Sequence, residues 1–280
     1  TGLIVGKGLK NGLEKAVTYA MPTMFVLLLI IAGYAAINGD FAQTIRFMFY
    51  PDFSKLTFSG VLIALGHAFF TLSLASGAMM IYGAYLPQKT SIAQSVVAIA
   101  IADTVIALIA GMAIYPIVFG NGLEATAGPG LVFVSLPIAF GQMWGGIVFG
   151  TIFFVMLGFA AFTSAIAMVE SAVAWLVERL SFTRGKAALT AVVSLWFVSM
   201  LTVFSFTGAE WAKLDFVFVG KHVSNYFELI DHLTADVLLP LGGLATAIFV
   251  AWVMQKEAVA QELNVSEKVF SVWYVTLRWF

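Results

Sequence analysis

Long apolar runs alternate with short polar segments along this chain, and six of the runs are long enough to cross a lipid bilayer. The predicted spans are residues 16–37, 60–86, 92–119, 144–180, 186–206 and 231–254. A membrane-spanning helix needs about 20 mostly apolar residues, and two of these runs are long enough to tilt or to extend into solvent. The pattern predicts an all-α, polytopic membrane helical bundle, which has the lipid bilayer as a partner.

Shorter segments have patterns of their own. Residues 120–142 contain a Gly-Pro-Gly sequence followed by LVFVSLPIAF, which is too short for a span and fits a re-entrant or surface hairpin. The segment KEAVAQELN at 256–264 predicts a short amphipathic surface helix, and residues 269–280 predict the beginning of another helix. The chain opens on Thr1 with TGLIVGKGLK, which reads as the tail of a helix leaving the membrane, so we expect a piece of a longer protein.

Composition supports a membrane protein and argues against several other classes. Of the 280 residues, 61% are hydrophobic and 10% are charged, whereas a soluble domain carries about 25% charged residues. The net charge of −1 gives no basis for a nucleic-acid partner. The chain has no Cys and no motif for nucleophilic, phosphate-binding or paired-carboxylate chemistry. We therefore expect no enzyme activity, no catalytic residues and no organic cofactor, while the oligomeric state is left open.

The 14 Lys and Arg residues lie mostly on one side of the predicted spans. Cytoplasmic loops of membrane proteins carry an excess of these residues. We therefore predict a multi-pass protein of the cell membrane in which the loops with Lys10, Lys89, Arg184 and Lys256 are cytoplasmic.

The second predicted span carries polar residues at mid-membrane depth. Its central stretch, GHAFFTLSLASG at 66–77, contains His67, Thr71, Ser73 and Ser76 between two glycines. Polar side chains in hydrocarbon cost free energy unless they have partners, and the backbone leaves the helix at that depth only where it lines a cavity. We predict that this helix unwinds at its centre and exposes backbone groups to an ion or a small polar solute.

Two further spans carry polar groups. Asp103 lies mid-span without a basic residue in the same run, which indicates a functional site, although a protonated or internally paired structural Asp is the alternative. In FAAFTSAIAM, Ala160, Thr163, Ser164 and Met168 share one helical face; such hydroxyls can instead bond to the preceding turn or join helices. Hydroxyls, carbonyls and one carboxylate suit a hard monovalent cation, so the predicted ion is sodium.

The other titratable residues in apolar runs give weaker indications. His67 is either a pocket residue or a buried imidazole with satisfied hydrogen bonds. His222 and His232 lie at the edges of spans and indicate no site. Glu170 lies off the face that carries Thr163, and we expect it to bond to a neighbouring helix.

Two glycine spacings have both a packing and a functional reading. Gly12 and Pro22 place a flexible point and a missing amide donor at the start of the first span, which is either an ordinary helix start with a proline kink or a stretch that unwinds to open an exit. Gly146 and Gly150 are expected to allow close helix packing.

Four motifs, in their order along the chain, resemble a known family. They are FFTLSLASGAMMIYGAY, IADTVIALIAGMAIYP, GPGLVFVSLPIAF and FAAFTSAIAM. The chain resembles the bacterial branch of the neurotransmitter:sodium symporters over essentially its whole length. That family has the LeuT fold, with inverted repeats and discontinuous helices. The resemblance implies a partial transporter domain: the end of helix 4 and helix 5 in residues 1–58, the second inverted repeat (helices 6–10, with a discontinuous helix 6) in 59–254, and a surface helix and the start of helix 11 in 255–280. Helices 1–3 would be missing.

The resemblance also implies roles for individual residues. Substrate-contacting positions are matched by Phe70, Thr71, Ser73, Ser76, Ser164 and Met168. Two sodium sites, both completed by the missing helix 1, are matched by Thr71 and Asp103 for the first ion and by Ala160, Thr163 and Ser164 for the second. Gating positions are matched by Phe70 as a lid, Asp231 as the outer-gate carboxylate, and Gly12 and Pro22 as the motif linked to cytoplasmic release.

Departures from the family pattern modify these expectations. Chloride-dependent relatives have Gln at the position of His67 and Ser at the position of Ala107, and Asp103 stands where Asn is common. Loss of these anion ligands together with a fixed carboxylate predicts transport without chloride. Ala75 replaces a Gly. Ser76 replaces a bulkier apolar residue, and this smaller wall favours a substrate with a larger side chain, such as an aromatic amino acid.

The residues and the resemblance together predict a sodium-coupled symporter of neutral, hydrophobic or aromatic amino acids that works by alternating access. The alternative belongs to another class: a non-transporting membrane module or truncated accessory chain that only packs against partners. A sodium effect on binding or uptake of an amino acid by the full-length protein would distinguish the two.

Overall fold

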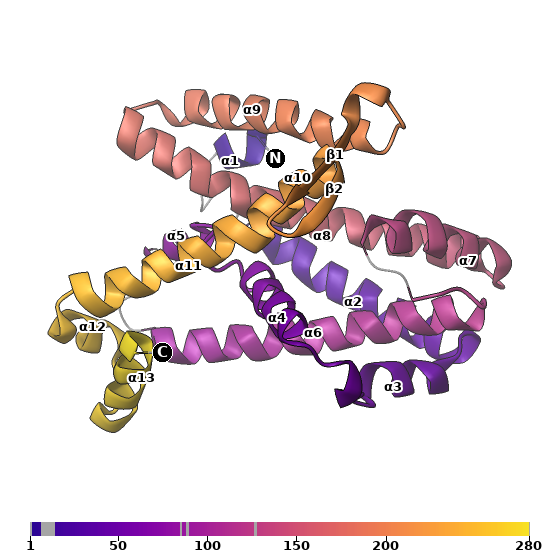
Figure 1. Cartoon of the computed structure of the whole chain (residues 1–280), viewed down its shortest axis with the longest axis horizontal. Coiled ribbons are helices and arrows are strands. Elements are labelled where there is room, and N and C mark those ends of the chain that lie inside the picture. The colour runs from indigo at the N-terminus through magenta and orange to yellow at the C-terminus, as the bar shows by residue number, and fades with distance from the viewer. Residues whose placement is uncertain (1, 7–14, 85, 88–89, 126–127, 280) are drawn as a thin grey trace. The chain divides into compact units, whose positions relative to one another are not determined.

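The structure is a computed structural model, and it describes residues 2–6, 15–84, 86–87, 90–125 and 128–279. Apart from the first two residues, the chain divides into two compact units, Leu3–Leu56 with Ala102–Ala167 and Thr57–Ile101 with Met168–Phe280. Two long helices, α6 (Ile92–Gly120) and α8 (Gly146–Leu180), each contribute one part to either unit. Figure 1 shows the elements along the chain.

The first unit is built on apolar helices. It contains α2 (Lys15–Asn38), α3 (Phe41–Phe49), the short η2 (Phe53–Lys55), the π-helical η3 (Leu131–Ser135), α7 (Leu136–Gln142) and the parts of α6 and α8 named above. Its core includes Ile31, Ile117 and Leu136, whose side chains are fully buried. The hydroxyl of Tyr34 donates to the Trp144 carbonyl at 2.7 Å, which links α2 to the turn before α8.

The second unit carries the remaining elements. They are α4 (Phe58–Thr71), α5 (Ala78–Ala84), α9 (Arg184–Ser205), η4 (Glu210–Ala212), β1 (Lys213–Phe218), β2 (Lys221–Asn225), α10 (Tyr226–His232), the π-helical η5 (Leu233–Leu238), α11 (Leu239–Ile248), the π-helical η6 (Phe249–Val253), α12 (Lys256–Leu263) and α13 (Glu267–Trp279). The short α1 (Gly2–Gly6) begins the chain.

A two-stranded antiparallel hairpin precedes the last long apolar segment. Phe216 pairs with Val223 and Phe218 with Lys221, and the register is irregular between Lys213 and Phe216. The turn at Val219 and Gly220 has positive φ angles of 49° and 78°. The hairpin packs on α10, where the two are continuous in sequence (Figure 1).

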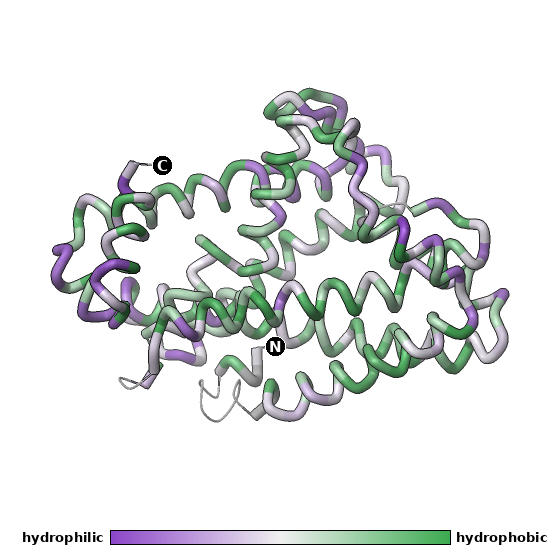
Figure 2. Tube along the Cα trace, turned by 90° about the horizontal axis from the view of Figure 1, so that it is seen from below, coloured by the Kyte–Doolittle hydropathy of each residue, from purple (hydrophilic) through white to green (hydrophobic). Residues whose placement is uncertain are grey.

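Five helices in the described part of the chain are long and apolar enough to cross a membrane: Val17–Asn38, Ile92–Gly120, Gly146–Leu180, Arg184–Ser205 and Tyr226–Val253. Hydrophobic residues run along these helices, and hydrophilic residues gather at their ends and in the connections (Figure 2). Large apolar side chains such as those of Leu189 and Phe197 are exposed, as expected for a surface that lipid covers.

The structure agrees with the predicted spans. The span predicted at 60–86 is present as α4 and α5 with a break between them. Within the segment predicted as a re-entrant or surface hairpin, Leu131–Gln142 forms a short apolar helix. The predicted close packing of the two glycines is confirmed, because a Cβ on Gly146 would overlap the Phe140 carbonyl and a Cβ on Gly150 would lie 3.1 Å from the Phe140 ring.

Gly39 allows the turn between α2 and α3 to touch α6, and we expect Gly39→Ala to destabilise the protein. The amide of Asp40 donates to the Pro116 carbonyl at 2.9 Å. A methyl group on Gly39 would overlap that same carbonyl, which is backbone and cannot rotate away. Such overpacking costs about 1–3 kcal/mol, measurable as a lower thermal unfolding midpoint in detergent.

A matched control lies on the neighbouring helix. Gly33 is on α2, and a Cβ there would meet nothing within 4 Å. Gly33→Ala should therefore leave the midpoint unchanged or raise it, because alanine favours the helix. Equal effects of the two substitutions would contradict the proposed contact at Gly39.

Candidate functional site

The backbone of the second predicted span leaves the α-helix between Thr71 and Ala78. The amide of Leu72 still bonds to the Ala68 carbonyl at 3.2 Å. The next two amides bond irregularly, from Ser73 to the Phe70 carbonyl at 3.0 Å and from Leu74 to the Phe69 carbonyl at 2.9 Å. The predicted discontinuity in this helix is therefore confirmed.

Alternating left-handed residues produce the break. Ser73, Ala75 and Gly77 have φ angles of 52°, 63° and 82°. Only the glycine adopts this conformation without strain, and each of the other two costs roughly 1–2 kcal/mol. The Ser76 hydroxyl donates to the Ser73 carbonyl at 2.9 Å and accepts from the Ala78 amide at 3.5 Å, so this side chain supports both the break and the start of α5.

Two glycines of α11 allow this helix to pack closely against the break. A Cβ on Gly242 would lie 2.9 Å from the methyl group of Ala75, and a Cβ on Gly243 would overlap the ring of Phe69. The absence of both side chains lets α11 approach the end of α4 and the unwound segment. The broken conformation is thus supported by tertiary packing as well as by local hydrogen bonds.

A largely apolar cavity of about 510 Å³ adjoins the break within the second unit. Residues from the end of α4, the break and α5, from α11 and η6, and from α12 and α13 line it, and its polar side chains are those of Thr246 and Glu262. Sodium needs several oxygen ligands, and this lining offers few. We therefore do not assign the ion to this cavity.

The predicted substrate residues at the break are accessible. The side chain of Phe70 is 51% exposed, Thr71 and Ser76 are exposed, and Ser73 is half-buried. The Thr71 hydroxyl lies 3.4 Å from the Ala68 carbonyl, a long and weak hydrogen bond. His67 is exposed on α4, so the reading of this residue as a buried imidazole is wrong.

Thr163 is the buried member of the predicted face on α8. Its side chain is 9% exposed, and its hydroxyl donates to the Phe159 and Ala160 carbonyls at 3.1 and 3.0 Å. A hydroxyl has one proton and two lone pairs, so an oxygen that donates along its own helix can still coordinate a cation. Ser164 is exposed beside it, and Ala160 is half-buried.

Asp103 is half-buried in the middle of α6. No hydrogen bond or ion pair joins its carboxylate to another residue that the structure describes. The paired structural role that was the alternative for this residue therefore has no support within the described chain.

The predicted residues are divided between the two units. Asp103, Ala160, Thr163 and Ser164 belong to the first, while the residues of the break belong to the second. Met168, one helical turn after Ser164 on α8, is exposed and is the first α8 residue of the second unit.

The predicted gating residues lie in three segments. Gly12 lies outside the described residues, whereas Pro22 lies inside α2, which continues through it. The Thr23 hydroxyl donates to the Tyr19 carbonyl at 2.8 Å in the turn around this proline. Asp231 is exposed near the end of α10.

Glu170 bonds to a neighbouring helix, as its position predicted, and it does so through an ion pair. Its carboxylate is buried, with a side chain 3% exposed, and accepts two hydrogen bonds from the Arg184 guanidinium at 2.7 and 2.8 Å. Arg184 is the first residue of α9, so the pair joins α8 to the next helix within the second unit.

His222 and His232, whose positions indicated no site, each contact a carboxylate. His222 lies 2.9 Å from the Asp215 carboxylate on the exposed hairpin. His232 lies 3.0 Å from the Asp236 carboxylate, which Lys221 also contacts at 2.8 Å. The spacing of four residues between His232 and Asp236 was the available indication, since residues four apart lie on one helical face.

Comparison with known proteins gives the family. The model of the sodium:neurotransmitter symporter family matches residues 2–280. An uncharacterized sodium-dependent transporter of Haemophilus influenzae is 33% identical over 97% of this chain and 58% of its own length. The sodium-dependent transporter YhdH of Bacillus subtilis is 32% identical over 99% of this chain and 61% of its own length.

A solved structure agrees with these relatives. The crystal structure of MhsT in complex with L-phenylalanine is similar with a TM-score of 0.88 and 35% identity, covering 99% of this chain and 62% of MhsT. The chain thus spans about three fifths of the length of these relatives, at 58%, 61% and 62%. The expectation of a LeuT-like helical membrane fold is confirmed. This chain belongs to the sodium:neurotransmitter symporter family.

Proposed function

We propose that the full-length protein is a sodium-coupled symporter of amino acids. The observation that carries the proposal is the unwound segment between Thr71 and Ala78, in a chain of this family. Broken helices at mid-membrane depth present partial charges from helix ends and free backbone groups to ions and polar substrates. An uninterrupted span would have neither.

Two sodium ions are the proposed coupling ions. Thr71 and Asp103 would contribute to the first site, and the Ala160 carbonyl with the Thr163 and Ser164 hydroxyls to the second. The remaining ligands would come from helix 1, which by the family resemblance precedes this chain. The buried position of Thr163 and the accessible carboxylate of Asp103 support these roles.

The proposed substrate is a neutral amino acid with a hydrophobic or aromatic side chain. Ser73, Ser76, Ser164 and Met168 would contact it, with Phe70 as the lid. Ser76 leaves more room than a bulky apolar residue would, and the related MhsT was crystallised with L-phenylalanine. A substrate carboxylate that completes the first sodium shell would make each ligand raise the affinity of the other.

Transport would proceed by alternating access. Phe70 and Asp231 would close the outer side, and the segment between Gly12 and Pro22 would open the cytoplasmic side. The excess of Lys and Arg supports a cytoplasmic position for the loops with Lys89 and Arg184. We also propose that helix 5 lies before residue 59 and that residues 59–254 form the second inverted repeat.

Transport is expected not to require chloride. His67 and Ala107 lack the side chains expected of anion ligands, and Asp103 supplies a fixed negative charge to the first sodium site. Replacing chloride by gluconate should leave the initial uptake rate within about 20% of its value, since no bound anion contributes to the coupling energy. A strict chloride requirement would overturn this expectation.

The function itself is tested with the full-length protein in proteoliposomes. Uptake of labelled L-phenylalanine should follow an inward sodium gradient, should stop when sodium is replaced by potassium or choline, and should collapse with a sodium ionophore. Sodium-independent behaviour in both binding and uptake, across a panel of neutral amino acids, would instead favour a non-transporting module.

A further inference from the structure

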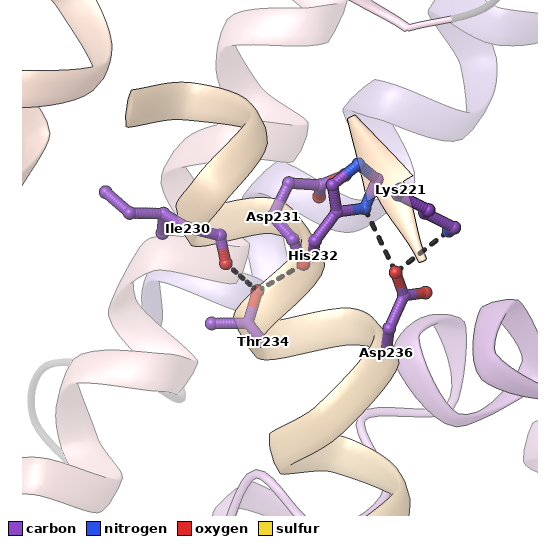
Figure 3. Close-up of polar contacts among 6 residues, drawn as sticks. All are labelled: Lys221, Ile230, Asp231, His232, Thr234 and Asp236. Atoms are coloured by element: carbon purple, nitrogen blue, oxygen red, sulfur yellow. Dashed lines mark hydrogen bonds and ion pairs between the residues drawn. The ribbon is translucent and has the colours of Figure 1, made fainter. Parts of the chain in front are cut away.

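Three side chains of the second unit meet at one carboxylate oxygen near the start of the last long apolar segment. Asp236 Oδ2 lies 2.8 Å from Lys221 Nζ and 3.0 Å from His232 Nδ1 (Figure 3). Lys221 is on strand β2, His232 is the last residue of α10, and Asp236 is on η5. The side chains of His232 and Asp236 are 20% and 28% exposed, so protons can reach them.

This contact ties the hairpin to η5, which directly follows α10, the helix that carries Asp231. The hairpin has a second attachment, since the Glu228 carboxylate accepts from the amide and the hydroxyl of Ser224 at 2.8 and 2.7 Å. Beyond α10 the backbone widens into the π-helical η5. There the Thr234 hydroxyl bonds to the Ile230 and Asp231 carbonyls at 2.8 and 3.1 Å (Figure 3).

The charges around the imidazole make the contact sensitive to its protonation. The charged side chains around His232 in the described chain include Asp236 on η5, Lys221 on β2, and Glu228 and Asp231 on α10. A carboxylate only accepts, so Nδ1 carries the proton when the ring is neutral. A charged ring donates a hydrogen bond roughly twice as strong as a neutral one, and it also repels the ammonium group that shares the oxygen.

We propose that His232 is a proton sensor that competes with Lys221 for Asp236. With a neutral ring, Lys221 holds the carboxylate and fixes the hairpin to the outer end of the segment. When the ring takes up a proton, Lys221 is displaced, the hairpin loosens, and Asp231 loses part of its positional support. The consequence for transport rests on the proposed function: external acid weakens closure of the outer gate and raises the KM for substrate.

Hydrogen exchange of the hairpin tests the sensor without any transport. In the full-length protein in detergent, amides of residues 213–225 should exchange about two- to fivefold faster at pH 5.5 than at pH 7.5 after correction for intrinsic rates, as expected for loss of a partly exposed ion pair. His232→Gln keeps an amide donor for Asp236 but cannot become charged, so it should remove the pH dependence. His232→Lys should give fast exchange at both pH values.

A matched control is on the hairpin itself. His222 pairs only with the exposed Asp215 among the described residues, so His222→Gln should retain the pH-dependent exchange of the wild type. Exchange that does not change with pH, or a pH dependence that survives in His232→Gln, would overturn the proposal.

Uptake provides the second readout. With the interior of the proteoliposomes held at pH 7.5, lowering the external pH to 5.5 should raise the substrate KM about two- to fivefold in the wild type, in line with the loss of the same ion pair, and not in His232→Gln. If the protein shows no sodium-dependent uptake at all, the proposed function fails. The hydrogen-exchange experiment still tests whether His232 acts as a proton sensor. If uptake is present but the KM changes equally in both proteins, the sensor does not control the gate.

Discussion

Replacing Thr163 with valine should raise the sodium concentration for half-maximal uptake by the full-length protein at least about tenfold, a loss of about 1.4 kcal/mol of binding free energy. Thr163 is buried on α8, and its hydroxyl donates a hydrogen bond shared between the Phe159 and Ala160 carbonyls. Those carbonyls keep their amide partners in the helix, so valine leaves the helix intact. What valine removes is the oxygen that we assign to the second sodium ion.

The controls separate the loss of a ligand from damage to the helix. Thr163→Ser retains a hydroxyl at the same position and should stay close to wild type. Thr151, also on α8, makes the same kind of bond to the Ile147 carbonyl at 2.7 Å and is exposed. Thr151→Val should therefore leave the sodium dependence unchanged. An unaltered sodium dependence in Thr163→Val would remove this residue from the ion site.

Arg184→Ala should destabilise the protein by about 3–5 kcal/mol, because it leaves a buried carboxylate without its cation. Glu170 is 3% exposed and receives both of its short hydrogen bonds at 2.7 and 2.8 Å from Arg184. The guanidinium is also the group that joins the start of α9 to α8. Unfolding in mixed detergent and SDS micelles, followed by tryptophan fluorescence, would measure the change.

An arginine outside such a pair gives the comparison. Arg179 is exposed in the last turn of α8, and its replacement by alanine should cost less than about 0.5 kcal/mol. Glu170→Gln should cost less than Arg184→Ala, since the remaining guanidinium is partly exposed and glutamine can still accept from it. Equal costs for the two arginine substitutions would show that the buried pair adds nothing to stability.

The spans were predictable because their cause is local. The first predicted span, residues 16–37, differs from α2 (Lys15–Asn38) by one residue at either end. The break was predictable for a similar reason, since serines and a glycine in the centre of an apolar run disfavour a continuous lipid-facing helix. The identity of the left-handed residues was not, because Ser73 and Ala75 have no intrinsic preference for positive φ.

Smaller elements were missed because their patterns are short. The helix α3 (Phe41–Phe49) is capped by the Asp40 carboxylate, which accepts from the Gln43 amide at 2.9 Å, yet nine residues are too few to stand out among spans. The hairpin is held by packing on α10 and by the ion pair between Lys221 and Asp236, a residue later in the chain. The π-helical segments depend on backbone geometry that hydropathy does not report.

The candidate site was predictable in its components but not in its bonding. A helical face with Thr163 and Ser164 follows from spacing alone. That one of these hydroxyls is buried and the other exposed depends on neighbouring helices. The contacts of Asp236 show the same limit, because Lys221, which shares this carboxylate with His232, comes from a strand that the hydropathy pattern did not reveal.

The contact between α11 and the unwound segment has an evolutionary consequence. The space that a methyl group on residue 242 would need is occupied by the methyl group of Ala75. The two positions share room for one such group, so a lineage that acquires alanine at 242 should be found with glycine at 75. Residues 75 and 242 would then change together during evolution, and an alignment of related sequences would show covariation between these two positions.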